Sequence, residues 1–268
     1  MGLRVIVSPA KRMRPGRDEV AARAVPSLTG RSRELLAALL GMGEGELRRL
    51  WKVGDRLLAS CLADLAALRE AGLPGDEDEL ARPSVARLAS PALLSYDGIQ
   101  YRSMAPDVMT DGELAWCQEH LRILSGLYGC LRPLDAVLPH RLEMGARLAA
   151  GAARDLYGFW GDAIAREVVA GEGEPVVANL ASVEYARAVL PRLPEGVPVV
   201  TCVFAEEVRD GRPVQRATAA KAARGSMVRW MAERGVRDAG ELASFDVGYR
   251  LEPGLGEPGR LVFLRDAR

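Results

Sequence analysis

Histidine and cysteine are scarce in this sequence, and their scarcity excludes several kinds of site. Only two histidines, His120 and His140, occur among 268 residues, so we expect no metal site built from histidine ligands. The four cysteines have neither CxxC spacing nor histidine partners, a pattern typical of buried free thiols in the reducing cytoplasm. They are Cys61, Cys117, Cys130 and Cys202. We therefore predict a cytoplasmic protein with no metal and no cofactor.

Long apolar runs are also absent, and this excludes a membrane span. No stretch of about 18 apolar residues occurs. The chain begins with a short strand-like segment, Leu3–Val7, rather than with the longer apolar core of a secretory signal. With 268 residues, 49% of them hydrophobic, the chain is long enough to bury a sizeable core. No membrane partner is therefore expected.

An excess of charge of either sign is missing as well. The formal net charge is zero, which argues against a simple polycation that wraps nucleic acid. The charge is nevertheless uneven, because residues 11–33 carry seven basic side chains and residues 209–237 carry eight, whereas residues 76–79 are all acidic. Segregated charge can build a positive cleft on a neutral protein. The alternative is a set of solvated helix faces, which is the usual fate of charge runs.

Lysine is the third scarce residue, with only three among the 36 basic side chains. The three are Lys11, Lys52 and Lys221. In a chain so biased toward arginine, a lysine that persists indicates a place where a guanidinium does not suffice, such as a compact phosphate contact or an amine that shifts its pKa. Lys11 and Lys221 are therefore candidates for a binding or catalytic site.

The stretch His120–Gly145 is dense in polar side chains, glycines and prolines without resembling a linker. A helix capped by Thr110 and Glu113 is predicted to lead into it and to end near Ser125. A half-buried strand is predicted after Pro139 from the alternation of charged and apolar residues. The stretch carries Arg122, Tyr128, Arg132, Arg141 and Glu143, a set that suggests a site for an anion. The alternative is an ordered surface loop with a structural Arg–Glu pair.

Two strand ends and one helix supply further candidates. The strand Leu3–Val7 runs into Lys11, and a loop at a strand end is where α/β proteins place ligands. The buried strand Pro175–Asn179 opens onto Ser182, predicted to cap the next helix, where Asn179 and Ser182 could hold an anion. A helix expected to be capped by Thr218 and closed by Gly235 places Lys221 and Arg224 on one face.

The remaining elements favour an α/β to α+β mixed fold. Strands lie mostly at the two ends of the chain with helices between them. We predict a single large domain, 1–268, with a central mixed sheet, a positively charged cleft, and a helical lobe of roughly 31–125 inserted between the strand-bearing ends. The expected helices are 31–40, about 47–70, 85–88 and 155–169, the further strands are 198–204 and 261–264, and a hairpin turn is expected at Asp210-Gly211.

Leu40-Gly41-Met42-Gly43 between two helices is similar to the turn of a helix-hairpin-helix module. In such modules glycine amides contact DNA phosphates. Glu44 and Glu46 would repel a phosphate, and a plain helical hairpin fits the pattern as well.

Several short motifs lie in order along nearly the whole chain. They are Ser8–Lys11, Trp51–Leu57, Tyr96–Gly98 with Tyr101, the central stretch, Asp155–Asp162, Asn179–Ser182 with Glu184-Tyr185, and Lys221–Gly225. Together they resemble the signature of the YaaA family, bacterial proteins associated with resistance to peroxide stress. At Ile99-Gln100 the chain departs from the acidic and β-branched pair usual in the family. The resemblance implies one mixed fold with a helix-rich lobe, double-stranded DNA held in a positive cleft, and roles in limiting oxidative DNA damage and in iron handling.

Two functions follow, and we expect a monomer in either case. The first is a DNA-binding protein of the peroxide stress response, which contacts duplex DNA through its basic side chains. The second is an enzyme on a small anionic or nucleotide-like substrate, since a glutamate is not needed to bind phosphate. Its candidate catalytic residues are Lys11, Tyr128, Glu143 and Lys221. The anion- or DNA-binding candidates are Lys11, Lys52, Arg122, Arg132, Arg141, Asn179, Ser182, Lys221 and Arg224. An iron site is not favoured, because no ligand cluster is visible.

Overall fold

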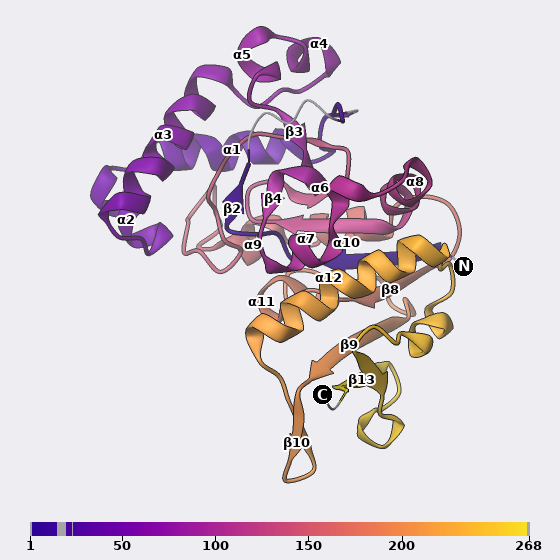
Figure 1. Ribbon diagram of the computed structural model, residues 1–268. Helices are drawn as coiled ribbons and strands as arrows, with labels where there is room; N and C mark the ends of the chain where they lie inside the picture. Colours follow the sequence, from indigo (N-terminus) through magenta and orange to yellow (C-terminus); the bar gives the residue numbers. More distant parts are fainter. Residues whose placement is uncertain (1, 15–19, 23, 267–268) are drawn as a thin grey trace.

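A seven-stranded mixed sheet forms the centre of the computed structural model, which describes residues 2–14, 20–22 and 24–266 (Figure 1). The strand order is β12-β13-β9-β8-β1-β5-β6. The five inner strands are parallel, and β12 and β6 add antiparallel edges. The bounds are β1 Gly2–Val7, β5 Leu121–Ser125, β6 Gly129–Leu131, β8 Pro175–Asn179, β9 Val199–Ala205, β12 Tyr249–Leu251 and β13 Arg260–Arg265. The predicted α/β mixture is confirmed.

Strand β1 lies in the interior of the sheet, between β8 and β5, and its residues are almost all apolar. Val5 pairs with Leu121 of β5 on one side and with Ala178 of β8 on the other. From Leu3 to Val7 every residue is buried, including Arg4. Continuous burial of this kind is typical of parallel strands whose two faces are both covered by helices.

Strand order reverses beside β1. The chain passes from β1 to β5 on one side, and later returns to β8 on the other side. In open α/β sheets, ligands bind outside the carboxyl ends of the strands at such a reversal. We call the side of the sheet where the parallel strands end the carboxyl edge, and the side where they begin the amino edge.

Between β1 and β5 the chain is mainly helical, and α1, α2 and α3 project from the sheet (Figure 1). The short ribbon of β2 with β4 lies within this part, and that of β3 with β7 connects it to the chain after β5. The bounds are β2 Arg12–Met13, α1 Thr29–Leu40, α2 Glu44–Trp51, α3 Asp55–Ala71, α4 Glu77–Leu80, α5 Pro83–Ala86, β3 Ser90–Pro91, α6 Ala92–Ser95, β4 Tyr96–Asp97, α7 Ile99–Met104, η1 Pro106–Val108, α8 Asp111–His120 and β7 Ala136–Val137.

The C-terminal half alternates strands and helices, and its longest helix, α12, packs against α7 and β9 (Figure 1). The predicted hairpin at Asp210-Gly211 is confirmed, with both residues at positive φ. Gly235 closes α12 in the left-handed conformation, as expected. The bounds are α9 Leu156–Trp160, α10 Ala163–Val169, α11 Val183–Ala186, η2 Leu190–Arg192, β10 Glu207–Arg209, β11 Arg212–Val214, α12 Ala217–Arg234, η3 Ala239–Ser244 and η4 Pro253–Leu255. No helix in the described part of the chain is long and apolar enough to cross a membrane.

The capped helix before the central stretch ends earlier than predicted. Thr110 and Glu113 form the expected capping box, but the helix stops at His120, and Leu121–Ser125 is the buried strand β5. A short apolar run fits one face of a helix as well as it fits a central parallel strand, so periodicity alone does not separate the two.

Five further details of the secondary structure also differ from the prediction. The segment after Pro139 alternates in burial as predicted but pairs with no strand. The predicted helices 47–70 and 155–169 are each two helices, interrupted at Lys52 and Gly161, both at positive φ. Residues 77–80, where the acidic side chains lie and no helix is predicted, form the helix α4. The N-cap residue of α12 is Arg216 rather than Thr218, and its side chain makes no capping hydrogen bond.

Gly225 of α12 allows the close packing of α12 on α7, and this contact can be tested by substitution. A methyl group at residue 225 would overlap the carbonyl oxygen of Gln100. Gly225→Ala should therefore destabilise the protein by about 1–3 kcal/mol or more, the usual cost of overpacking. Gly30→Ala in α1 is the matched control, because no atom lies within 4 Å of the added methyl, and we expect it to be neutral or stabilising. Urea unfolding of the two variants measures both effects, and equal stabilities would contradict the packing described.

Candidate anion-binding site at the carboxyl edge

Ser8 follows β1 at the reversal point and contacts both the helices and the end of β8. Its carbonyl oxygen accepts hydrogen bonds from Gln100 Nε2 (3.2 Å) and from the Tyr101 hydroxyl (3.0 Å). Its hydroxyl accepts the backbone N–H of Ser182 (2.9 Å) and donates to the Ser182 hydroxyl (3.1 Å). Gln100, where the chain departs from the family pattern, therefore has a structural partner in Ser8.

Asn179 and Ser182 lie close to Ser8, but their side chains are largely used for hydrogen bonds within the protein. The Asn179 side-chain oxygen accepts the N–H of Ala181 (3.0 Å), and its nitrogen donates to the hydroxyl of Thr201 (3.3 Å). Ser182 is the N-cap residue of α11, yet its hydroxyl makes no capping bond and faces Ser8 instead. The turn is thus rigid, with two adjacent serine hydroxyls at its opening.

Lys11, Arg141 and Glu143 form the charged part of the site. Lys11 Nζ lies 2.7 Å from one carboxylate oxygen of Glu143, and Arg141 lies 3.3 Å from the other. The Lys11 side chain is 63% exposed, whereas those of Glu143 and Arg141 are 29% and 11% exposed. The structural Arg–Glu pair considered for this stretch therefore exists. Lys11, from the loop after β1, also pairs with its glutamate.

The loop that carries Glu143 is fastened over the end of β8. The N–H of Gly145 donates to the Glu184 carboxylate (2.8 Å), and the Tyr157 hydroxyl donates to the Glu184 carbonyl oxygen (3.0 Å). Gly126 permits the close approach of this loop, since a Cβ there would overlap the backbone of Leu142. Charged and polar groups from three distant segments thus come together. We call Ser8, Lys11, Arg141, Glu143, Asn179 and Ser182 the carboxyl-edge site.

Lys221 and Arg224, both on α12, differ in their surroundings. Lys221 is exposed and forms no ion pair with any residue that the structure describes. Arg224 is partly buried, and its Nε finds no hydrogen-bond partner there. Burial lowers the pKa of Arg224 below its ordinary value. Lys52 ends α2 in the left-handed conformation and points into solvent on the projecting helices.

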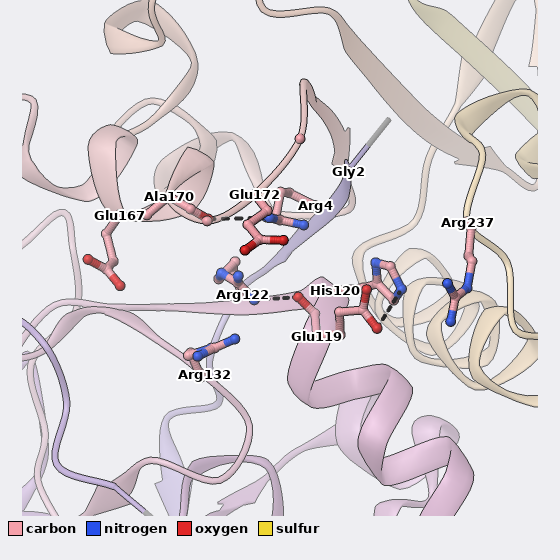
Figure 2. A pocket seen from close by; sticks show the side chains of 12 residues that line it. Gly2, Arg4, Glu119, His120, Arg122, Arg132, Glu167, Ala170, Glu172 and Arg237 are labelled. Atoms are coloured by element: carbon pink, nitrogen blue, oxygen red, sulfur yellow. Dashed lines mark hydrogen bonds and ion pairs between the residues drawn. The ribbon is translucent and has the colours of Figure 1, made fainter.

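Three other predicted site residues lie elsewhere. Arg122 and Arg132 line a cavity at the amino edge together with Arg4 (Figure 2). Tyr128 is buried, and its hydroxyl accepts the backbone N–H of Leu138 (3.1 Å). Burial raises the Tyr128 pKa above its ordinary value. The central stretch therefore contributes to two separate places and not to one site.

The cysteines do not resemble reactive thiols. All four are free and buried, which agrees with the expected absence of disulfides. Burial raises the pKa of Cys117 and of Cys202 to about 12, and it also raises those of Cys61 and Cys130. Within the described ranges no group of three or more histidine, cysteine, aspartate or glutamate side chains is arranged to hold a metal ion.

The fold and the carboxyl-edge site together define an α/β protein with a polar, partly cationic site at the reversal point of a parallel sheet. Comparison with known proteins makes this class more specific. Residues 3–255 match the family described as peroxide stress protein YaaA, so the chain belongs to that family. It is 38% identical to UPF0246 proteins of Pediococcus pentosaceus and Lactiplantibacillus plantarum, covering 98% of this chain and 98% and 99% of theirs. It is 36% identical to a UPF0246 protein of Desulfitobacterium hafniense over 98% of each chain.

Burial of the thiols leads to a simple test. In the folded protein the four cysteines should react with Ellman's reagent far more slowly than a free thiol, because the reactive thiolate is both inaccessible and disfavoured. After unfolding in denaturant without reductant, four thiols should react per chain. A count of two would indicate a disulfide, and rapid labelling of the folded protein would indicate an activated cysteine.

Proposed function

We propose that this peroxide stress protein binds duplex DNA through the carboxyl edge of its sheet. The supporting observation is that exposed basic side chains leave this edge from separate segments. The loop after β1 carries Lys11, Arg12 and Arg14, and the β10–β11 hairpin and the start of α12 carry Arg209, Arg212, Arg216 and Lys221. Arg17 and Arg23 of the predicted basic segment lie outside the described residues.

Part of this positive charge is already neutralised within the protein. Arg216 pairs with Glu206 at 3.0 Å, Arg209 with Glu207 at 2.7 Å, and Arg14 with Asp97 at 3.3 Å. Arg12, Arg212 and Lys221 form no ion pair with described residues, so they are the first candidates for phosphate contacts. Because some basic side chains are already paired with carboxylates, only a few can contact phosphates. We therefore expect DNA binding to be reversible.

The helix-hairpin-helix resemblance does not add to this proposal. The N–H groups of Gly41 and Met42 donate to the carbonyl oxygens of Ala37 and Leu39, and that of Gly43 donates to the Glu46 carboxylate (2.8 Å). A hairpin that binds DNA offers such amides to phosphate oxygens. Here they are occupied, and Glu46 lies in front of them.

The proposal predicts binding that depends on salt and not on sequence. Each neutralised phosphate contributes about −0.9 to the slope of log affinity against log salt. Lys221→Ala should therefore make the slope shallower by about 0.9 and weaken binding to two unrelated duplexes equally. Arg166→Ala is the control, because Arg166 is an exposed arginine of α10 paired with Asp162. A flat salt response, or a strong preference for one duplex, would rule the proposal out.

A second candidate, an enzyme on a small anionic or nucleotide-like substrate, is supported by the carboxyl-edge site itself. A lysine in contact with a half-buried glutamate, two adjacent serine hydroxyls and a rigid turn at the reversal point are more than phosphate binding requires. In this reading Glu143 is the general base, and Lys11 is the acid or the electrostatic clamp.

Glu143→Gln separates the two candidates because only the enzyme candidate predicts a loss of function. For a DNA-binding surface, loss of a carboxylate between two cations should leave binding intact or strengthen it. For an enzyme, loss of the base should abolish the protection of cells against peroxide even though the protein still folds and binds DNA. We expect DNA affinity and survival of peroxide both to be retained. Lys11→Arg is the companion variant, and thermal unfolding controls for the fold.

A further inference from the structure

The amino edge of the sheet contains a cavity of about 560 Å³ that neither proposed function uses. It lies where β1 and β5 begin, on the opposite side of the sheet from the carboxyl-edge site. Figure 2 shows Arg122 and Arg132 below Arg4, and Arg237 beyond His120. We call it the amino-edge cavity. Its lining is Gly2, Arg4, Glu119, His120, Arg122, Arg132, Glu167, Ala170, Gly171, Glu172, Gly173 and Arg237.

Arg4 and Arg122 are unusual because they are charged residues on central parallel strands. They are only 6% and 3% exposed. Arg4 donates to the carbonyl oxygens of Leu3 and Ala170, both at 3.3 Å, and its Nε has no partner. Arg122 Nη1 donates to the carbonyl oxygens of Glu119 and Leu121, at 3.0 and 2.9 Å. Both guanidinium groups are thus held in place by neutral acceptors, with no carboxylate paired to them among the described residues.

Two glycines leave the space that the Arg4 guanidinium group occupies. Gly171 has a φ of +109°, and a Cβ there would lie 2.9 Å from Arg4 Nη2. A Cβ at Gly2 would lie 3.2 Å from Arg4 Nη1. The loop after α10 therefore combines a glycine conformation with close approach to the arginine, and a side chain at either glycine would displace it.

The arginines of this cavity repel one another. Burial lowers the pKa of Arg122 first, and the nearby charges of Arg4 and Arg132 lower it further. Burial also lowers the pKa of Arg4, whereas the charge of Glu119 raises it and that of Arg132 lowers it. Asp135, the nearest buried acid of the β6–β7 turn, accepts the backbone N–H of Arg132 (2.7 Å) and is not paired with its side chain. Glu119 and Glu167 offset part of this repulsion, but neither forms an ion pair with a described arginine of the cavity. A buried cation without an ion-pair partner is costly, and an anion that contacts several such cations reduces the cost.

We propose that the amino-edge cavity binds the phosphate group of a small molecule. A planar guanidinium fork matches the oxygens of a phosphate, and several such forks around one group are the usual arrangement for it. The cavity is far larger than one phosphate and falls within the range of small-ligand pockets, about 300–1,000 Å³. The remaining space therefore accommodates the organic part of the ligand.

The acidic side chains of the lining indicate which chemical groups the organic part of the ligand carries. Glu119, Glu167 and Glu172 border the cavity without pairing with its arginines. The Glu119 carboxylate lies 3.7 Å from His120 Nε2 (Figure 2). Carboxylates disfavour a second anion but accept hydrogen bonds from hydroxyl groups. The ligand class is thus a phosphomonoester of a hydroxyl-bearing molecule, such as a sugar phosphate.

Calorimetric titration with inorganic phosphate and with ribose 5-phosphate tests this assignment. We expect saturable binding of ribose 5-phosphate, tighter than that of inorganic phosphate. Arg132→Gln and Arg122→Gln should each weaken binding by about tenfold or more, because each removes charge-assisted hydrogen bonds. Arg166→Gln, at an exposed arginine outside the cavity, should leave it unchanged. Arg132 is exposed, so Arg132→Gln keeps the test valid if Arg122→Gln fails to fold.

The thermal stability of the free protein provides an independent readout. Arg132→Gln removes one of the mutually repelling charges, so it should not lower the midpoint of unfolding. At a fixed concentration of ribose 5-phosphate, however, it should reduce the stabilisation that the ligand gives. No saturable binding of either probe up to about 10 mM, or wild-type binding by Arg132→Gln, would overturn the assignment. Displacement of ribose 5-phosphate by a short DNA duplex would also overturn it, because the ligand would then be nucleic acid.

Discussion

The contacts of Ser8 hold together the parts of the molecule on which the carboxyl edge depends. Its carbonyl oxygen connects β1 to α7 through Gln100 and Tyr101, and its hydroxyl connects β1 to the end of β8 through Ser182. Because α7 in turn packs on α12 at Gly225, the contacts of Ser8 also help to position α12, whose first turns carry basic side chains. The protein thus has a reversal point fixed by hydrogen bonds, with basic side chains around it.

The two edges of the sheet carry basic side chains in different environments. At the carboxyl edge, cations are exposed, and several are balanced by glutamates such as Glu143 and Glu206. At the amino edge, Arg4 and Arg122 are buried and bonded only to carbonyl oxygens. Exposed, half-neutralised charge suits a large partner bound through its phosphates, whereas buried charge without an ion-pair partner suits a small anion that enters a cavity. A chain with no net charge can therefore present two sites for anions.

Local signals in the sequence were sufficient wherever the structure is determined by short-range chemistry. The capping box of Thr110, the hairpin at Asp210-Gly211 and the closing Gly235 are examples, because each involves neighbouring residues. Long-range packing was not predictable in this way. Leu121–Ser125 is a strand because β1 lies beside it. Arg122 is far from Arg141 because it lies at the start of β5, whereas the loop that carries Arg141 packs against Gly126, beyond the end of β5. Of the arginines that line the amino-edge cavity, Arg122 and Arg132 are among the predicted anion-binding residues, whereas Arg4, within an apolar strand, is not.

Hydrogen–deuterium exchange with and without a duplex tests most directly whether the carboxyl edge is the DNA-binding surface. We expect DNA to slow exchange in the segments Ser8–Arg14 and Arg209–Lys221, while the loop Ala170–Gly173 at the amino edge keeps its rate. Protection confined to the hairpin Leu40–Gly43, or to the amino edge, would contradict this account, because the basic segments around the reversal point would then not contact DNA.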